Sequence, residues 1–130
     1  MIVVDASVVA TAISVAGADG ERSRSRLLEG ADLHAPDLLD LEVLSVLRRR
    51  ASFGDIDEAG AGVAQEALSE LPLTRYPHLP FLPRVWTLRT NLNPYDAAYV
   101  ALAEALGCAL VTGDRRIERA PGIGCAVEVM

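Results

Sequence analysis

Short runs of apolar and often β-branched residues alternate along the chain with longer stretches of helical periodicity. The first run is Ile2 to Val4, and the later ones lie at 33–35, 73–75, 109–112 and 126–129. Short strands that are apolar throughout are typical of a parallel sheet covered by helices on both faces. We therefore expect a three-layer α/β/α domain with a central, mostly parallel sheet of about four to five short strands.

The segments between these runs have helical patterns, and capping or stop residues mark most of their ends. Asp37 is expected to cap the third helix, and Asn93 followed by Pro94 to start the last one. Two prolines in the preceding segment place the start of a further short helix at or after Pro83. The main expected helices span 8–15, 20–28 with a stop at Gly30, 38–52, 55–71 and 95–106.

The length of 130 residues predicts one domain, 1–130, with a core of its own. A hydrophobic content of 51% excludes a disordered chain. Cys108 and Cys125 lack C-x-x-C spacing and are expected to be buried thiols in a reducing cytoplasm. The N-terminus lacks the pattern of a signal peptide, and the apolar stretch at 97–111 is too short to cross a membrane and contains Glu104. We expect a cytoplasmic protein with no membrane partner.

The overall charge argues against a nucleic-acid partner. Eighteen acidic residues outnumber 12 basic ones, for a formal net charge of −6, whereas nucleic-acid-binding domains usually carry an excess of positive charge. All the basic residues are arginines, the side chain best suited to bidentate contacts with phosphate. The distribution of charge must therefore decide the question.

Four carboxylates lie at special places in the expected fold. Asp5 directly follows the first strand, and Asp114 comes two residues after the strand that ends at Thr112. Asp96 lies in the first turn of the helix leading to that strand, and Glu42 on a largely apolar side of the third helix. The carboxyl ends of parallel strands form the usual ligand-binding edge of such a sheet.

Each of these acids has an ordinary structural interpretation. Asp5 and Asp114 are each placed to cap the helix or turn that follows, and Asp96 sits where a helix favours negative charge. Glu42 has Arg49 on the same helix as a candidate partner. A convergent set of four is different, because unpaired carboxylates repel one another unless protons or cations offset the charge. Sites made only of oxygen ligands suit Mg²⁺ or Mn²⁺.

The four motifs resemble those of a known family. Val4 to Ser7 looks like the opening of PIN-domain nucleases, in particular the VapC-type toxins of bacterial toxin–antitoxin pairs. The segments 36–44, 93–104 and 110–114, which contain the other three acids, are similar to later motifs of that family in order and spacing. The resemblance covers essentially the whole chain. It departs from the family at Ser45, where many relatives have Asn.

The resemblance implies a Mg²⁺-dependent endoribonuclease, with Mn²⁺ as a plausible substitute. Asp5, Asp96 and Asp114 would be metal ligands, and Glu42 would complete the catalytic set by orienting a water. Ser7 and Thr112 would be supporting donors or ordinary turn residues, and Arg115 and Arg116 candidate contacts to RNA. The ion would lower the pKa of a water and neutralise charge on the phosphoryl group. No histidine is required, and His34 and His78 have no evident partners in the sequence.

The resemblance also implies partners. They are an RNA substrate, a cognate antitoxin that covers the site, and a second copy of the chain in a homodimer. Leu41, Leu44 and Leu47 form apolar ridges on the third helix that fit either such an interface or the core.

Three alternatives remain open. A phosphatase of the haloacid-dehalogenase type is disfavoured, because Ser7 stands where that family has a second Asp and the chain has no Lys. A PIN-like binding module without catalysis is a second alternative, although all four acids are present. A metal-dependent nuclease that acts on DNA is the third. If the four acids form one site, much of the negative charge is concentrated there, and RNA is no longer excluded.

Overall fold

The structure is a computed structural model that describes residues 1–29 and 32–130. Its centre is one five-stranded sheet in which all four pairings are parallel, in the order β3-β2-β1-β4-β5. The expected strand number and orientation are thus confirmed. The strands are β1 (Ile2–Val4), β2 (Leu33–Pro36), β3 (Leu73–Tyr76), β4 (Ala109–Thr112) and β5 (Val127–Val129).

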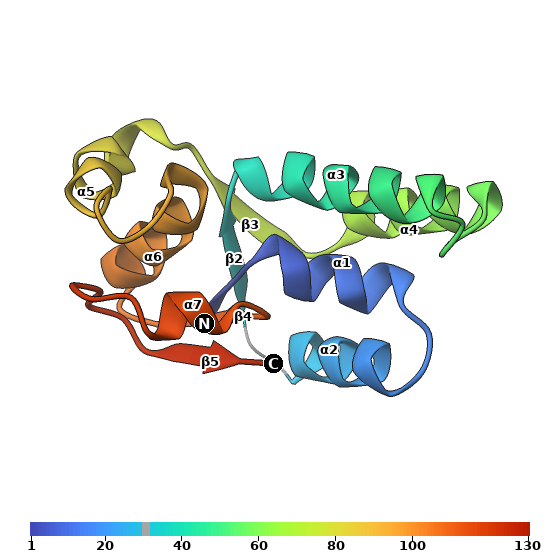
Figure 1. Cartoon of the computed structure of the whole chain (residues 1–130). Helices are drawn as coiled ribbons and strands as arrows, with labels where there is room; N and C mark the ends of the chain where they lie inside the picture. Colours follow the sequence, from blue (N-terminus) through green and yellow to red (C-terminus); the bar gives the residue numbers. More distant parts are fainter. Residues whose placement is uncertain (30–31) are drawn as a thin grey trace.

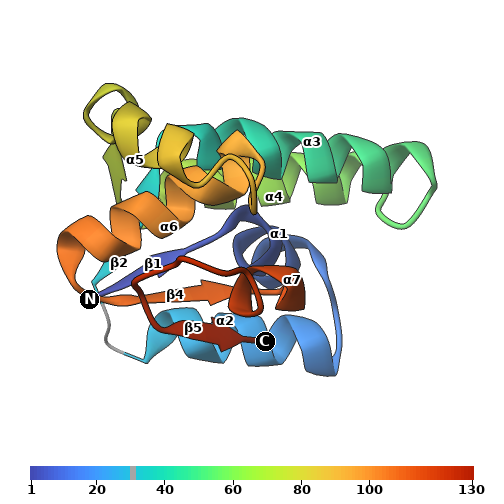
Figure 2. The ribbon, with the colours of Figure 1, turned by 60° about the vertical axis from the view of Figure 1, so that its left-hand side comes forward.

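Helices cover both faces of the sheet, which confirms the three-layer α/β/α architecture. Figure 1 shows α1 to α4 on one side of the sheet and α5 and α6 on the other. Figure 2 shows α6 running across the sheet, and α6 contacts β1, β2 and β4. The helices are α1 (Ala6–Ser14), α2 (Ala18–Leu28), α3 (Leu38–Ser52), α4 (Glu58–Glu70), the 3₁₀ turn η1 (Leu79–Phe81), α5 (Leu82–Thr87), α6 (Pro94–Leu106) and α7 (Arg115–Glu118).

The order of the strands creates a switch point between β1 and β4. From β1 the chain builds outward to β2 and β3, and it then returns to the other side of β1 to form β4 and β5. The core lies on both sides of these central strands, where Val3, Val4, Leu110 and Val111 have no exposed surface. Small residues such as Ala97 are fully buried in α6, which lets this helix lie close to the sheet.

Helix starts differ from the expected ones where capping was misjudged. Asp37 makes no side-chain capping bond, because its own backbone is already helical (φ −53°, ψ −30°). The N–H of Leu38 instead donates to Nε2 of His78 at 3.0 Å. The fourth helix begins at Glu58 rather than Asp55, because Asp57 has an extended backbone and caps it through the N–H of Gly60.

Other local expectations also need correction. A helix begins before Pro83, at Leu82, since proline is tolerated in a first turn. His34 has a partner, because a 2.8 Å hydrogen bond joins its Nδ1 to the hydroxyl of Tyr76. Cys108 and Cys125 are free but only half-buried. The expected stop at Gly30 lies outside the described residues. Among those residues, no helix combines the length and the hydropathy needed to cross a membrane.

Candidate active site

Asp5 and Asp114 lie side by side in the topology, at the carboxyl ends of β1 and β4. These strands are neighbours at the switch point, the usual place for a ligand in an open α/β sheet. Both residues are also helix caps. Asp5 Oδ1 accepts from the N–H of Ser7 at 2.8 Å, and Asp114 Oδ1 from the N–H of Arg116 at 2.9 Å. The expected role of these two acids as caps is therefore confirmed, and both still lie at the carboxyl edge of the sheet.

All four candidate acids line one open cavity of about 310 Å³. Glu42 reaches it from α3 and Asp96 from the first turn of α6, so four separate segments contribute. Asn93 fixes the start of α6 by accepting from the N–H of Asp96 at 2.8 Å. The other lining residues are Ala6, Ser7, Ser45, Val46, Arg49 and Tyr99. The convergence inferred from topology is thus present in the fold.

Asp5 is the most enclosed of the four, at 7% exposed. The hydroxyls of Ser7 and Thr112 donate to its two carboxylate oxygens, one to each. Burial raises the pKa of Asp5, although these hydrogen bonds and those from the backbone act in the opposite direction. The hydroxyls thus hold the carboxylate in one orientation at the floor of the cavity.

Glu42 is held by a tyrosine that the sequence analysis did not single out. The hydroxyl of Tyr99 donates to Glu42 Oε2 at 2.6 Å, and Tyr99 is only 2% exposed. Burial raises the pKa of Glu42, and the charges of Asp96 and Asp5 raise it further. Arg49 lines the cavity but forms no ion pair with Glu42 in the part of the chain described. The available signal was that Tyr99 lies three residues after Asp96, on the same face of the helix.

Asp96 and Asp114 experience different electrostatic environments. Burial raises the pKa of Asp96, and the nearby charge of Asp114 adds to the effect. Arg116 lowers the pKa of Asp114, because its guanidinium lies 2.5 Å from Asp114 Oδ2. Arg116 is therefore paired with a carboxylate of the site, although its side chain, like that of Arg115, is exposed.

The chemical type of these side chains suits a divalent cation, but their positions in the structure do not yet form a complete metal site. Carboxylate oxygens are the ligands that Mg²⁺ and Mn²⁺ prefer, and four line one cavity. Within residues 1–29 and 32–130, however, no three His, Cys, Asp or Glu side chains are already arranged to hold an ion. Asp114 is paired with Arg116, so this guanidinium would compete with a cation for the Asp114 carboxylate.

Known proteins share both the sequence pattern and the fold. The PIN domain family matches residues 2–123. Ribonuclease VapC9 of Mycobacterium tuberculosis is 42% identical over 130 residues, which cover all of this chain and 98% of that protein.

Solved structures agree with these matches at the level of the fold. The M. tuberculosis toxin VapC20, described as cleaving the sarcin–ricin loop, superposes with a TM-score of 0.73 at 14% identity, covering 95% of this chain and 97% of that one. VapBC2 of Rickettsia felis, solved bound to a DNA fragment from its promoter, gives 0.66 at 18% identity, covering 100% and 99%. The chain therefore belongs to the PIN domain family, among the VapC ribonucleases.

Proposed function

We propose that the chain is a metal-dependent endoribonuclease that serves as the toxin of a toxin–antitoxin pair. The observation that carries this proposal is the set of four carboxylates lining one cavity at the switch point. Asp5, Glu42 and Asp96 have raised pKa values and, in the described residues, no arginine partner. Such a group is costly for folding and is explained most simply by a cation that it binds.

Each residue has a defined part in this proposal. Asp5 and Asp96 would hold the cation directly, with Asp114 binding a second ion or acting through water. A bound Mg²⁺ or Mn²⁺ supplies Lewis-acid stabilisation of the phosphoryl group and lowers the pKa of water. Glu42 orients the attacking water, and Tyr99 fixes the carboxylate of Glu42 by its hydrogen bond.

The arginines near the cavity support RNA as the substrate. Arg49 lines the cavity, and Arg115 and Arg116 follow Asp114 at the start of α7. Arg116 is paired with Asp114, so a phosphate that takes over this guanidinium would also release a carboxylate for a cation. RNA lies in the cytoplasm, which is the compartment we propose.

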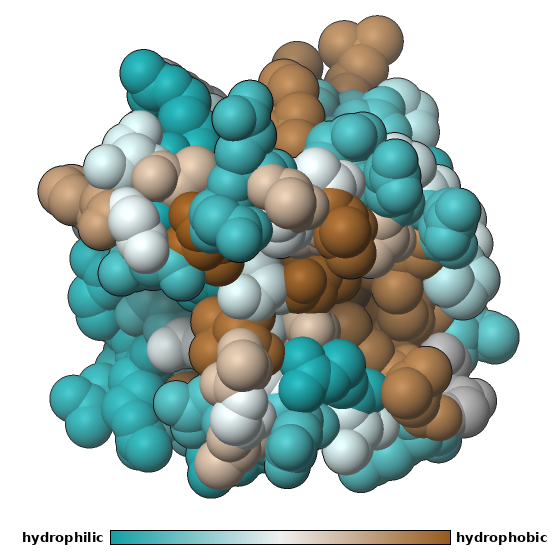
Figure 3. All heavy atoms as spheres, turned by 90° about the vertical axis from the view of Figure 1, so that its right-hand side faces the viewer, coloured by the Kyte–Doolittle hydropathy of each residue, from teal (hydrophilic) through white to brown (hydrophobic). Residues whose placement is uncertain are grey.

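An antitoxin is the second partner that we propose. Apolar side chains line a groove of about 380 Å³ between α1, α2 and α4, where Leu28 is 81% exposed. Figure 3 shows apolar surface around a hollow on the side of the molecule that carries these helices. Leu41 and Leu44 on α3 are also exposed, whereas Leu47 belongs to the core. The homodimer stays a prediction, which light scattering on the purified protein tests.

The test of the proposed activity combines metal removal with one substitution. Purified protein should cleave single-stranded RNA with Mg²⁺ or Mn²⁺, and EDTA should stop the cleavage. Asp5→Asn should abolish cleavage while the circular dichroism spectrum stays that of the wild type. Asp57→Asn is the matched control, because Asp57 also caps a helix but lines neither the acidic cavity nor its neighbour.

Other outcomes identify the alternatives. Cleavage that persists in EDTA would contradict the metal requirement. No cleavage of any RNA would favour a binding module, and cleavage of DNA alone would favour the DNA-directed nuclease. For the toxin role, induced expression of the wild type should arrest bacterial growth, and expression of Asp5→Asn should not.

A further inference from the structure

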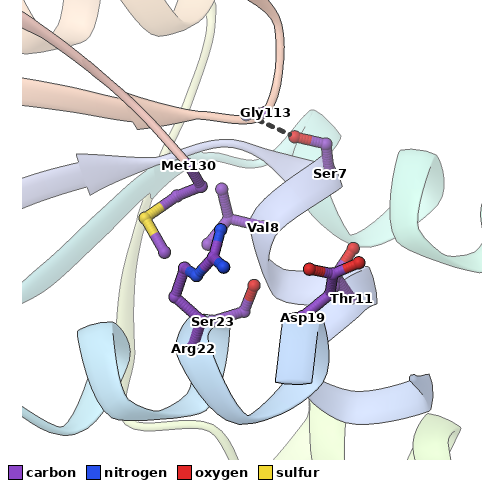
Figure 4. A pocket seen from close by; sticks show the side chains of 8 residues that line it. All are labelled: Ser7, Val8, Thr11, Asp19, Arg22, Ser23, Gly113 and Met130. Carbon is purple, nitrogen blue, oxygen red and sulfur yellow. Dashed lines mark hydrogen bonds between the residues drawn. The ribbon is translucent and has the colours of Figure 1, made fainter. Parts of the chain in front are cut away.

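A second cavity, of about 330 Å³, lies on the other side of Ser7 from the acidic one. It is formed between α1, α2, the loop after β4 and the C-terminal residue, as Figure 4 shows. Neither the four acids nor the proposed hydrolysis uses it. Its lining combines a cation, hydroxyl groups and apolar side chains with one acidic residue, Asp19, whereas four acids line the first cavity.

The two cavities share a wall that consists of one side chain. Ser7 lines both, and its hydroxyl donates to Asp5 and accepts from the N–H of Gly113 at 2.9 Å. A Cβ at position 113 would lie 2.9 Å from the Ser7 oxygen, so only glycine permits this approach. A polymer that has one phosphate at the acids therefore has the second cavity directly beside it.

The cation in this cavity is Arg22, and it differs from the other arginines of α2. Arg24 donates to the carbonyl of Ala12 at 2.9 Å, and Arg26 is paired with Glu128 at 2.7 Å. Arg22 forms no ion pair within residues 1–29 and 32–130 and is exposed. Figure 4 shows its guanidinium turned into the cavity, toward Val8 and Met130. Arg22 is thus available for an anion next to the acidic site.

The remaining side chains suit a nucleotide better than a bare anion. Met130 offers a partly exposed apolar side chain for the face of a base, and the buried Val8 lies beside it. Thr11 offers a hydroxyl, and Asp19 offers a carboxylate that accepts hydrogen bonds from the amino group of a base but repels phosphate. Single-stranded RNA is recognised in this way, by apolar contact with unstacked bases and hydrogen bonds to their edges.

We propose that this cavity binds the nucleotide next to the cleaved phosphodiester. In this arrangement Arg22 contacts the phosphate of that nucleotide and Asp19 contacts the edge of its base. The inference rests on the proposed ribonuclease function and adds a position at which the enzyme selects its RNA. The apolar floor and the single carboxylate predict a preference for a base with an exposed amino group.

Binding tests the contact with Arg22. The affinity for a short single-stranded oligoribonucleotide is measured by fluorescence anisotropy with Ca²⁺ in place of Mg²⁺, and a gel verifies that the RNA stays intact. Arg22→Gln should weaken binding about tenfold and lower the slope of log affinity against log salt by roughly 0.7, the value for one phosphate contact. Arg89→Gln removes the same charge from a side chain that stacks on Trp86 and lines neither cavity, so its affinity should match the wild type.

Activity separates this inference from the proposed function. Bis(p-nitrophenyl) phosphate has no flanking nucleotide, so Arg22→Gln should hydrolyse it as the wild type does while its KM for RNA rises. Asp19→Asn should change the preferred base beside the cleavage site and leave hydrolysis of the small ester unchanged. If the wild type cleaves RNA but Arg22→Gln matches it in both RNA affinity and KM for RNA, the second cavity does not bind RNA and the inference is overturned. If the wild type cleaves neither substrate, the proposed function itself fails.

Discussion

Two groups of carboxylates in this molecule have opposite environments. Three on the outer elements form bidentate ion pairs with arginine, each with contacts of 2.7 and 2.9 Å. These pairs connect segments that are distant in the chain. They are Asp40 with Arg75, Glu104 with Arg84, and Glu128 with Arg26.

Three carboxylates of the acidic cavity, Asp5, Glu42 and Asp96, have no such partner in the described chain. Their pKa values are raised, first by burial, whereas arginine lowers the pKa values of Glu104 and Glu128. The same chemical group therefore stabilises the fold in one region and strains it in the other. Asp114 shares features of both groups, because it lines the acidic cavity and is paired with Arg116.

The largest expected effect concerns activity. Asp96→Asn should lower RNA cleavage by about a thousandfold, or ~4 kcal/mol in the barrier, because it removes a charge from the proposed metal site. Glu128→Gln, a carboxylate of the paired group, should retain cleavage close to that of the wild type. Rates at saturating Mg²⁺ measure both. Equal losses in the two variants would show that the distinction between the groups has no functional meaning.

The next effect is a loss of stability, which we expect for the carboxylates that are paired with arginine. Glu104 is 16% exposed, and it accepts both from Arg84 and from the N–H of Gly124 at 2.6 Å. Glu104→Gln should lower the free energy of unfolding by about 1–2 kcal/mol, a value reduced by the solvent exposure of Arg84, and should lower Tm by about 5 °C. Thermal and urea unfolding measure it, with RNA cleavage retained at a temperature where the variant is folded. A Tm equal to that of the wild type would refute a structural role for the pair.

The smallest effect is a gain in stability within the acidic cavity. Glu42→Gln keeps an acceptor for the hydroxyl of Tyr99 but removes a charge whose burial is unfavourable. At pH 7 without metal, it should raise the free energy of unfolding by at most about 1 kcal/mol, because Glu42 is only half-buried and solvent screens its charge.

The pH dependence of the free energy of unfolding tests whether the charge of Glu42 causes this gain. Because the pKa of Glu42 is raised above its ordinary value of 4.5, the folded protein binds this proton more tightly than the unfolded chain. In the wild type, the buried charge of Glu42 lowers the free energy of unfolding. This loss is absent below the ordinary pKa and develops as pH rises through the folded pKa. The gain of Glu42→Gln should therefore be small at pH 4 and larger at pH 7. A gain that is constant across this range would mean that charge is not its cause.

The acids could be located from the sequence because their positions follow from local patterns. Asp5 comes directly after an apolar strand and Asp114 two residues after another, and Asp96 follows Asn93 and Pro94 in a helix start. In a parallel sheet these places necessarily lie at one edge. The roles assigned to the individual acids stay predictions.

The partners of these acids could not be predicted in the same way. Tyr99 and Glu42 are 57 positions apart, and His78 and Leu38 are 40 apart, so no local pattern connects them. Arg116, expected to be a contact to RNA, is paired with Asp114 two positions away, because the turn at the start of α7 brings the two side chains together. The expected cap at Asp37 was wrong for a related reason, since the tertiary position of His78 supplies a different acceptor.

The sequence by itself determined the parallel three-layer sheet and the edge at which its acids gather. Periodicity and strand ends are local properties, and burial on both faces leaves few alternatives for short apolar strands. Only the tertiary structure decided which carboxylates are paired with arginine, which are left unpaired in the acidic cavity, and that Ser7 separates that cavity from a second one containing Arg22. These features depend on contacts between distant segments, and their electrostatics arise from burial, which no single segment determines.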